Sequence, residues 1–209
     1  GVTTLDTGEI VLTSSDSDSL VVSAPAPSAL LKVKVWNHET VAQDAGDAAA
    51  RWLSDCLQRD CRLVQVPAQH ARQVDPVYAR PGEQVGFADG FPLLLIGQAS
   101  LDDLSRRVGR PLEMLRFRPN LVVSGSSPYA EDSWRRIRIG ELELRVVKGC
   151  SRCIMTTLDP ATGERSADRE PLQTLKTFRE RDGEVYFGQN LIAEGCGELR
   201  LGMPVEVLE

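Results

Sequence analysis

The chain of 209 residues is long enough for one large domain or two small ones, and its 42% hydrophobic and 26% charged residues are typical of globular proteins. The formal net charge of −6 argues against binding to polymeric nucleic acid or to an anionic membrane, because both need a basic surface. The sequence has no signal peptide and no apolar run of about 18 residues, so we expect no membrane span.

The first third of the chain is predicted to be β structure interrupted by one helix. Short β-favouring runs, in part alternating apolar and polar residues, predict strands at 9–13, 19–23, 32–36 and 62–66. Small and apolar residues at helical spacing predict a helix that opens at Asp44 and continues through Leu57. His38 is expected in a turn, and the proline-containing segment 67–86, which includes His70, is expected to be a loop or a crossing between domains.

The second part of the chain is predicted to be richer in strands. A turn at Asp89 leads into a buried strand at 93–96, and Ser100 to Asp103 has the pattern of a capping box for a helix ending near 108. Further strands are expected at 121–124, 136–139, 142–147, 154–158, 185–187 and 199–208, with a turn at 159–163 and a helix near 171–179. Many strands and few helices predict a mostly β fold, a β-rich α+β barrel or sandwich-like domain.

The Cys150-Ser151-Arg152-Cys153 motif is the most informative stretch, and neither common interpretation of Cys-x-x-Cys fits it. A redox pair opens a helix, whereas the β-branched run after Cys153 predicts a strand. A structural zinc needs four ligands, and the remaining candidates form no second close pair: Cys56, Cys61, Cys196, His38 and His70. One thiolate is therefore expected to serve as a soft ligand or a nucleophile. Arg152 beside it could lower the thiol pKa or bind phosphate.

Three polar clusters are further candidates, each with a plainer alternative. Arg116, Arg118 and Asn120 precede a strand and could hold an anionic cofactor, or could be exposed arginines with an Asn-capped turn. Asp89 could be a site carboxylate or a turn residue that bonds its own backbone. The adjacent carboxylates at 131 and 132 could be a catalytic pair or part of a solvated loop.

Six motifs in fixed order make the chain similar to a known family. They are FADGFPLLLI (87–96), RFRPNLVV (116–123), AEDSW (130–134), CSRCIMTTLDPATG (150–163), EPLQTLK (170–176) and FGQN (187–190). Together they resemble the MOSC family, the molybdenum cofactor sulfurase C-terminal domain group. The resemblance is to its two-part branch, which includes the amidoxime-reducing components and their bacterial counterparts. It covers about residues 80–209, and it implies a MOSC β-barrel at 71–209 preceded by a partial β-barrel-like domain at 1–70.

The resemblance also implies a site. Cys153 would be the protein ligand of molybdenum in a pyranopterin molybdenum cofactor, whose dithiolene supplies two further sulfurs. Arg118, Asn120, Ser151 and Arg152 would hold the cofactor, and Asp89 would lie close to the metal. The implied activity is reduction of N-hydroxylated compounds such as amidoximes and hydroxylaminopurines, with electrons from a separate reductase.

Two other functions remain open from the sequence. The chain could be a cofactor-binding or sulfur-carrier module with a persulfide on Cys153. The resemblance also associates the family, though no residue of this chain in particular, with pyridoxal phosphate binding. It could instead be a non-catalytic fragment, because family members begin with a cofactor-binding segment that we do not find and because Gly1 is not a natural start. Five cysteines without the density of a disulfide scaffold favour a reducing compartment, and we expect a cytoplasmic location.

Overall fold

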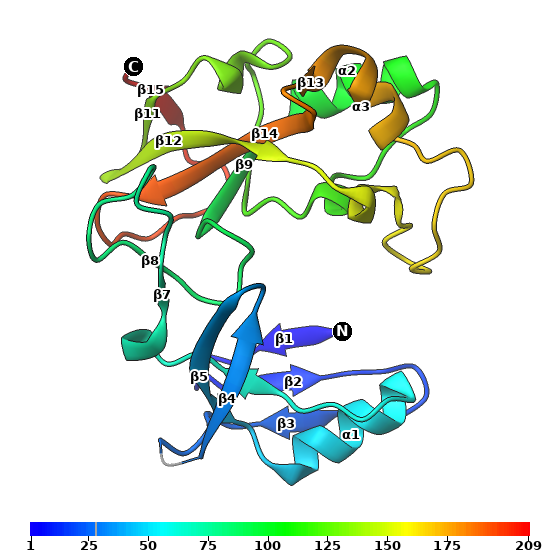
Figure 1. The fold of residues 1–209 in the computed structure, drawn as a ribbon, viewed down its shortest axis with the longest axis vertical. Coiled ribbons are helices and arrows are strands. Elements are labelled where there is room, and N and C mark those ends of the chain that lie inside the picture. Colours follow the sequence, from blue (N-terminus) through cyan, green and yellow to red (C-terminus); the bar gives the residue numbers. More distant parts are fainter. Residues whose placement is uncertain (28) are drawn as a thin grey trace. The chain divides into compact units, whose positions relative to one another are not determined.

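The computed structural model describes residues 1–27 and 29–209 (Figure 1). The chain divides into two compact units, the first made of residues 1–73 and 84–89 and the second of residues 74–83 and 90–209. The predicted mostly β fold with few helices is confirmed. Among the described residues, no helix combines the length and the apolar character that crossing a bilayer requires.

The first unit contains two three-stranded antiparallel sheets, a two-stranded sheet and one helix. The sheets are β1 (Val2–Thr4), β2 (Ile10–Leu12) and β3 (Leu20–Val22); β4 (Leu30–Val35), β5 (His38–Asp44) and β6 (Val64–Gln65); and β7 (Arg72–Gln73) with β8 (Gln84–Val85). Helix α1 (Asp47–Leu57) packs Ala49 against Leu12 and Val22, so its small-residue face is the one that is buried.

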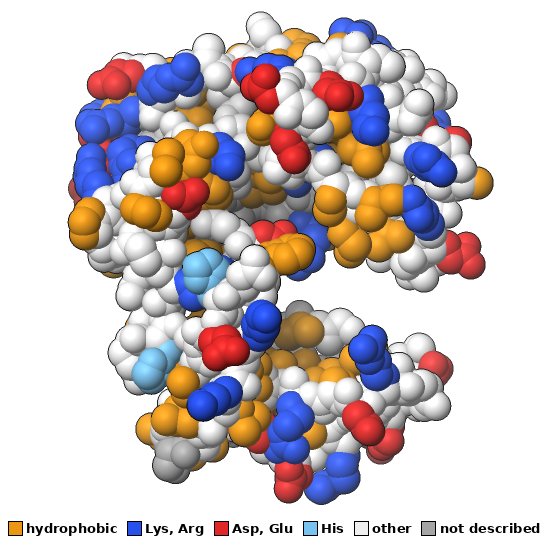
Figure 2. All heavy atoms as spheres, viewed as in Figure 1, with side chains coloured by type: hydrophobic (Ala, Val, Ile, Leu, Met, Phe, Trp, Pro, Cys, Tyr) orange, Lys and Arg blue, Asp and Glu red, His pale blue; other side chains and the backbone are white. Residues whose placement is uncertain are grey.

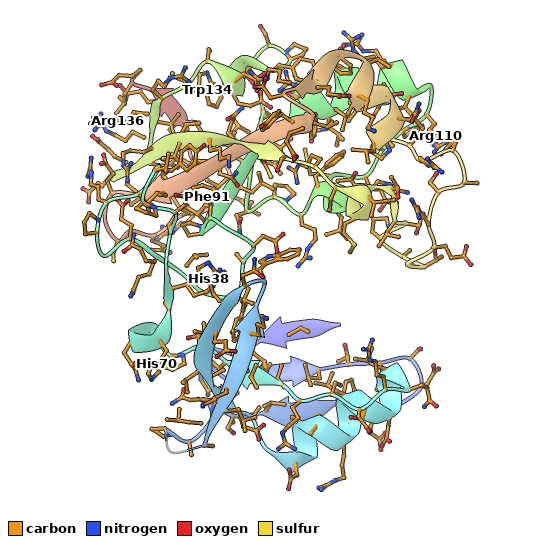
Figure 3. All side chains as sticks on the ribbon, viewed as in Figure 1. His38, His70, Phe91, Arg110, Trp134 and Arg136 are labelled. Carbon is orange, nitrogen blue, oxygen red and sulfur yellow. The ribbon has the colours of Figure 1, made fainter. Side chains whose placement is uncertain are left out.

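Two expectations for the first unit are wrong. His38 is the first residue of β5, a strand that the sequence did not reveal, because the turn occupies Trp36 and Asn37 and leaves Val35 opposite His38 (Figure 3). The segment around His70 is not an uninterrupted loop. It holds the 3-10 helix η1 (Ala68–His70) and the short pair β7–β8, and Thr40 donates a hydrogen bond to the His70 carbonyl at 2.8 Å.

The second unit is built on a seven-stranded, nearly closed barrel-like sheet. Its order is β10–β9–β14–β12–β11–β15, with β13 paired to β14. The strands are β9 (Leu93–Gly97), β10 (Leu121–Val123), β11 (Arg136–Ile139), β12 (Leu142–Ser151), β13 (Glu180–Arg181), β14 (Glu184–Ala193) and β15 (Val205–Val207). The β9–β10 pair is parallel and the other pairs are antiparallel.

Two hydrophobic clusters fill the second unit, one on each face of β9. Leu95 belongs to the cluster that includes Trp134 and Leu144, whereas its neighbour Ile96 belongs to the one that includes Leu104. This division follows from the alternation of side chains along a strand. Helices α2 (Gln98–Val108) and α3 (Leu172–Arg179) cover the second cluster, which also contains the aromatic pair described below.

The start of α2 differs from the predicted capping box. The helix begins at Gln98, so Ser100 lies inside its first turn and no side chain of the helix caps it. The buried carboxylate of Glu131 takes that place, because it accepts hydrogen bonds from the Gly97 backbone N–H at 3.0 Å and from the Ser100 hydroxyl at 2.7 Å. A carboxylate at a helix N-terminus satisfies free N–H groups and complements the helix dipole.

Candidate functional site

Strands β12 and β14 carry the Cys-x-x-Cys segment at an irregular part of their pairing. Gly149 pairs with Gln189 and Ser151 with Tyr186, so β14 has one more residue than β12 between these pairs. The extra length includes Gly188, whose φ of +78° belongs to the left-handed region. A bulge of this kind bends the strand and redirects the side chains beside it, and bulges are common next to functional sites. Here the bulge lies where the cysteine motif leaves the sheet.

The run after Cys153 is not the predicted strand. Residues Ile154–Thr157 form the 3-10 helix η4, and Cys153 is its N-cap residue. The hydroxyl of Thr156 donates to the Cys153 carbonyl at 3.1 Å, and that of Thr157 donates to the Ile154 carbonyl at 2.7 Å. These threonines are buried and satisfy the turn with their own hydroxyls, so local hydrogen bonding outweighs their β propensity.

The thiol of Cys153 lies on an exposed, apolar part of the second unit. Cys153 is exposed, and the two residues after it, Ile154 and Met155, are 42% and 57% exposed. Leu115, in the 3-10 helix η2 (Met114–Phe117) that packs against η4, is 63% exposed. Figure 2 shows hydrophobic side chains gathered over this part of the unit, next to basic ones. The site therefore combines a free thiol with an apolar surface.

Arg152 points into the protein from the residue before Cys153. Its Nε donates to the Phe187 carbonyl at 2.7 Å and its Nη1 to the Phe117 carbonyl at 3.1 Å. The two phenylalanine rings are buried and pack with centroids 4.6 Å apart, and the guanidinium lies 5.5 Å from the Phe117 ring centroid. Arg152 thus connects η2, β14 and the cysteine segment.

The guanidinium of Arg152 retains one unused donor. Its Nη2 is buried and has no hydrogen-bond partner among the described residues. Burial lowers the pKa of Arg152, and the neighbouring thiols of Cys150 and Cys153 oppose that shift. A buried cation with a free N–H favours negative charge nearby.

Arg118 and Asn120 flank the entrance to β10. Arg118 adopts φ +51° after η2, and its exposed side chain makes no hydrogen bond or ion pair with the described residues. The backbone and side chain of Asn120 both pair with Leu94: the Asn120 N–H donates to the Leu94 carbonyl and its Oδ1 accepts from the Leu94 N–H, each at 2.9 Å. The Asn120 side chain therefore extends the β9–β10 pairing and keeps its amide N–H₂ for another acceptor.

The structure brings Arg118, Arg152 and Cys153 into one connected group through the Phe117 carbonyl. Ser151, the last residue of β12, is exposed and adjoins this group. Asp89 lies in the first unit, where Trp36 Nε1 donates to its Oδ1 at 3.3 Å. Its expected place near the metal stays a prediction.

Glu131 and Asp132 are not the solvated loop that the sequence suggested. Glu131 is 1% exposed and is fully engaged at the start of α2. Asp132 is half-buried and accepts hydrogen bonds from Arg179 and from Gln189, the latter at 2.7 Å. Both carboxylates hold neighbouring segments together by hydrogen bonds, and the oxygens of both are engaged in these bonds.

Arg116, which the sequence made a candidate for holding an anionic cofactor, uses both of its Nη atoms to bond the protein itself. Its Nη1 donates to the Leu158 carbonyl at 2.6 Å and its Nη2 pairs with Asp159 at 3.2 Å, while its buried Nε has no partner among the residues described. No local pattern predicted the bond from Arg116 to Leu158, which lies 42 residues further along the chain.

The donor set suits a large anionic group that brings its own metal ligands. Within residues 1–27 and 29–209, no three His, Cys, Asp or Glu side chains gather to hold a metal by themselves. One exposed thiol, an exposed arginine and two buried guanidinium N–H groups in need of acceptors are present instead. These residues fit a cofactor that needs one soft protein ligand and several donors.

Comparison with known proteins shows which family and which curated relatives the chain is similar to. The family described as MOSC domain matches residues 82–206. Mitochondrial amidoxime-reducing component 1 is 40% identical over 202 residues in Mus musculus and 38% identical over 202 residues in Homo sapiens. Both alignments cover 90% of this chain and 59% of the relative.

Mitochondrial amidoxime reducing component 2 of Macaca fascicularis is 35% identical over 211 residues, covering 94% of this chain and 62% of the relative. The chain thus spans about 60% of the length of these curated relatives. The matched segment contains the Cys153 site and all of the barrel-like sheet except the last residue of β15. The chain belongs to the MOSC domain family.

Proposed function

We propose that this chain binds a pyranopterin molybdenum cofactor through Cys153 and takes part in the reduction of N-hydroxylated compounds. The observation that carries the proposal is the exposed Cys153 thiol directly after the buried Arg152 guanidinium, which has an unused donor. Membership of the MOSC family and the names of the relatives, which speak of amidoxime reduction, support it.

Cys153 is the proposed metal ligand, because its side chain is exposed and a thiolate suits a soft metal centre. When bound, the cofactor would supply two-electron oxygen-transfer chemistry. Cys150, which is half-buried, would stay unligated. The 3-10 helix η4 fixes the backbone of Cys153 through the hydroxyl of Thr156, so the thiol is presented from an ordered turn.

The proposed cofactor-holding residues differ in the donors they still have free. Arg118 offers a whole guanidinium, and Asn120 offers its amide N–H₂. Arg152 offers Nη2, since Nε and Nη1 are committed to carbonyls. Ser151 offers an exposed hydroxyl. Directional donors of this kind orient phosphate and pterin acceptors. Asp89 is proposed to lie near the metal.

The proposed substrates are amidoximes, hydroxylaminopurines and related N-hydroxylated compounds. The apolar side chains of Ile154 and Met155 are exposed beside the thiol and suit the carbon body of such molecules. A separate reductase is proposed to supply the two electrons of each turnover. A cytoplasmic location stays a prediction, and the word mitochondrial in the relatives' names applies to those proteins.

A sulfur-carrier role for Cys153 is the second candidate, favoured by the exposed thiol beside an arginine. A persulfide on Cys153 would release thiocyanate with cyanide and would need no molybdenum. A non-catalytic role, which the sequence left open, is the third candidate.

The three candidates are separated by one assay set on protein expressed in a host that makes the cofactor. We expect reduction of an aromatic amidoxime with a chemically reduced viologen dye as electron donor, loss of turnover in Cys153→Ala, and retention in Cys150→Ala. Thiocyanate release without metal would identify the sulfur carrier. Folded protein that shows no turnover and releases no thiocyanate would contradict both the reductase role and the sulfur-carrier role.

A further inference from the structure

We propose that Arg116 is a positioning residue of the Cys153 site. It would act together with Arg152 to fix the cysteine-bearing turn against η2. The inference rests on the proposed function for its meaning, but its geometry and part of its test are independent of any cofactor. Nothing in the motif comparison assigns a role to Arg116.

The two arginines make reciprocal contacts. Arg152, from the cysteine segment, donates to the carbonyl of Phe117 in η2 at 3.1 Å. Arg116, from η2, donates to the carbonyl of Leu158, directly after η4, at 2.6 Å. The Arg152 guanidinium therefore bonds the backbone of η2, and the Arg116 guanidinium bonds the backbone at the end of the cysteine segment. The bonds meet the cysteine segment on both sides of Cys153, at Arg152 and at Leu158.

The contacts are shielded from solvent, which makes them strong restraints. The side chain of Arg116 is 15% exposed, and Phe117 is 2% exposed. Charge-assisted hydrogen bonds of this kind exceed neutral ones in strength, and a buried cation that loses its acceptor is left unsatisfied. Asp159 adds an ion pair to Arg116 at 3.2 Å and is itself held by the backbone N–H groups of Ala161 and Thr162.

The consequence concerns the relative placement of Arg118 and Cys153. The Phe117 carbonyl belongs to the peptide group that begins Arg118, so the Arg152 bond helps to fix the plane from which Arg118 projects. The Leu158 bond of Arg116 fixes the far end of η4. Loss of Arg116 would therefore free the turn that presents the thiol while the sheet stays intact.

The test compares Arg116→Met with Arg116→Lys and with the control Arg136→Met. Arg136 (Figure 3) lies in the same unit and makes two ion pairs, with Glu143 and Glu194, neither of which belongs to the cysteine segment. Hydrogen exchange measured by mass spectrometry on protein prepared without molybdate reports the turn directly. Molybdenum per mole in protein from a cofactor-competent host reports the site.

We expect Arg116→Met to raise the exchange rate of the 153–158 backbone by about tenfold or more, because the turn loses one of its two anchors. Exchange in β11 and β12 should stay within about twofold of wild type. Molybdenum content should fall in Arg116→Met and recover in part in Arg116→Lys, which can restore one hydrogen bond. Arg136→Met should change neither quantity.

Wild-type exchange at 153–158 in Arg116→Met would overturn the proposal, as would faster exchange spread evenly over the unit. If Arg116→Met does not fold, the same comparison is made with Arg116→Lys, for which unchanged exchange and metal content would overturn it. Wild-type protein without molybdenum would instead count against the proposed function, and the exchange result would still decide the role of Arg116.

Discussion

Arg179 donates to both carboxylate oxygens of Asp132, at 2.6 and 2.9 Å. The pair joins the last residue of α3 to the 3-10 helix η3 (Ala130–Asp132), and the Arg179 side chain is 11% exposed. Arg179 also donates to the Tyr186 carbonyl at 3.0 Å, next to the bulge that precedes the cysteine site. Asp132 therefore holds Arg179 against the Tyr186 carbonyl, and Tyr186 pairs with Ser151 of the cysteine motif.

Replacing Asp132 by Asn should destabilise the protein by about 2 kcal/mol, because the largely buried Arg179 would lose its charged partner. The free energy of unfolding from urea denaturation measures the effect. Glu141→Gln is the control, since Glu141 is exposed and makes no ion pair with any described residue. Equal stability of both variants would contradict the structural role of Asp132.

Replacing Glu131 by Ala should cost about 2–4 kcal/mol, because the Gly97 N–H and the Ser100 hydroxyl would lose a buried acceptor. Glu131→Gln keeps one acceptor oxygen and should cost less. The measurement is again urea denaturation, with the molybdenum content of the folded fraction determined in parallel. A Glu131→Ala protein as stable as wild type would contradict this structural role of Glu131.

Replacing Gly188 by Ala should destabilise the protein by about 1–3 kcal/mol. The residue has φ +78°, and an added Cβ would lie 2.6 Å from Ile96 Cγ1 and 2.8 Å from the Leu95 carbonyl oxygen. The same Cβ would approach Arg152 Nη2 at 3.3 Å, so exchange in the cysteine segment should also change. The thermal unfolding midpoint measures the stability loss, with Gly163→Ala as a comparison at an open left-handed glycine. A smaller shift for Gly188→Ala than for Gly163→Ala would contradict the packing argument.

Asp103 should contribute to the pH dependence of stability. Its pKa is lowered mainly by the hydrogen bond from Arg107, with a further contribution from the Tyr129 hydroxyl. A carboxyl whose folded-state pKa lies below its unfolded value near ~3.9 stabilises the protein above that pH and loses the contribution as pH falls. Wild type should therefore lose more stability between pH 6 and pH 3 than Asp103→Asn, measured by urea denaturation at each pH. Identical losses would show that Asp103 contributes nothing to this window.

Short apolar and β-favouring runs were enough to predict most strands of the sheet. A continuous apolar run predicted β9, alternation of apolar and polar residues predicted β12, and short β-favouring runs predicted β10 and β11; each of these strands buries at least one face. The mostly β fold with few helices followed from this pattern. The family motifs then pointed to Cys153 and Arg118, which the structure brings into one group through Phe117.

The parts of the structure that the sequence did not predict, η4 and the cap of α2, depend on contacts between residues far apart in the sequence. The 154–157 run favours a strand locally, and it forms η4 because the threonine hydroxyls bond the turn while Arg116 anchors its end. Ser100 resembles a cap, but the cap comes from Glu131, 31 residues away. No local pattern reveals such pairings, because they depend on where the sheet brings each segment.

Molybdenum and oxidised pterin per mole of protein, measured after expression in a host that makes the cofactor, test the central claim most directly. Wild type should contain both in near-equal amounts, Cys150→Ala should retain them, and Cys153→Ala should lose the metal while its thermal midpoint stays unchanged, since Cys153 is exposed. Equal metal content in wild type and Cys153→Ala, or none in folded wild type, would contradict Cys153 as the molybdenum ligand of this chain.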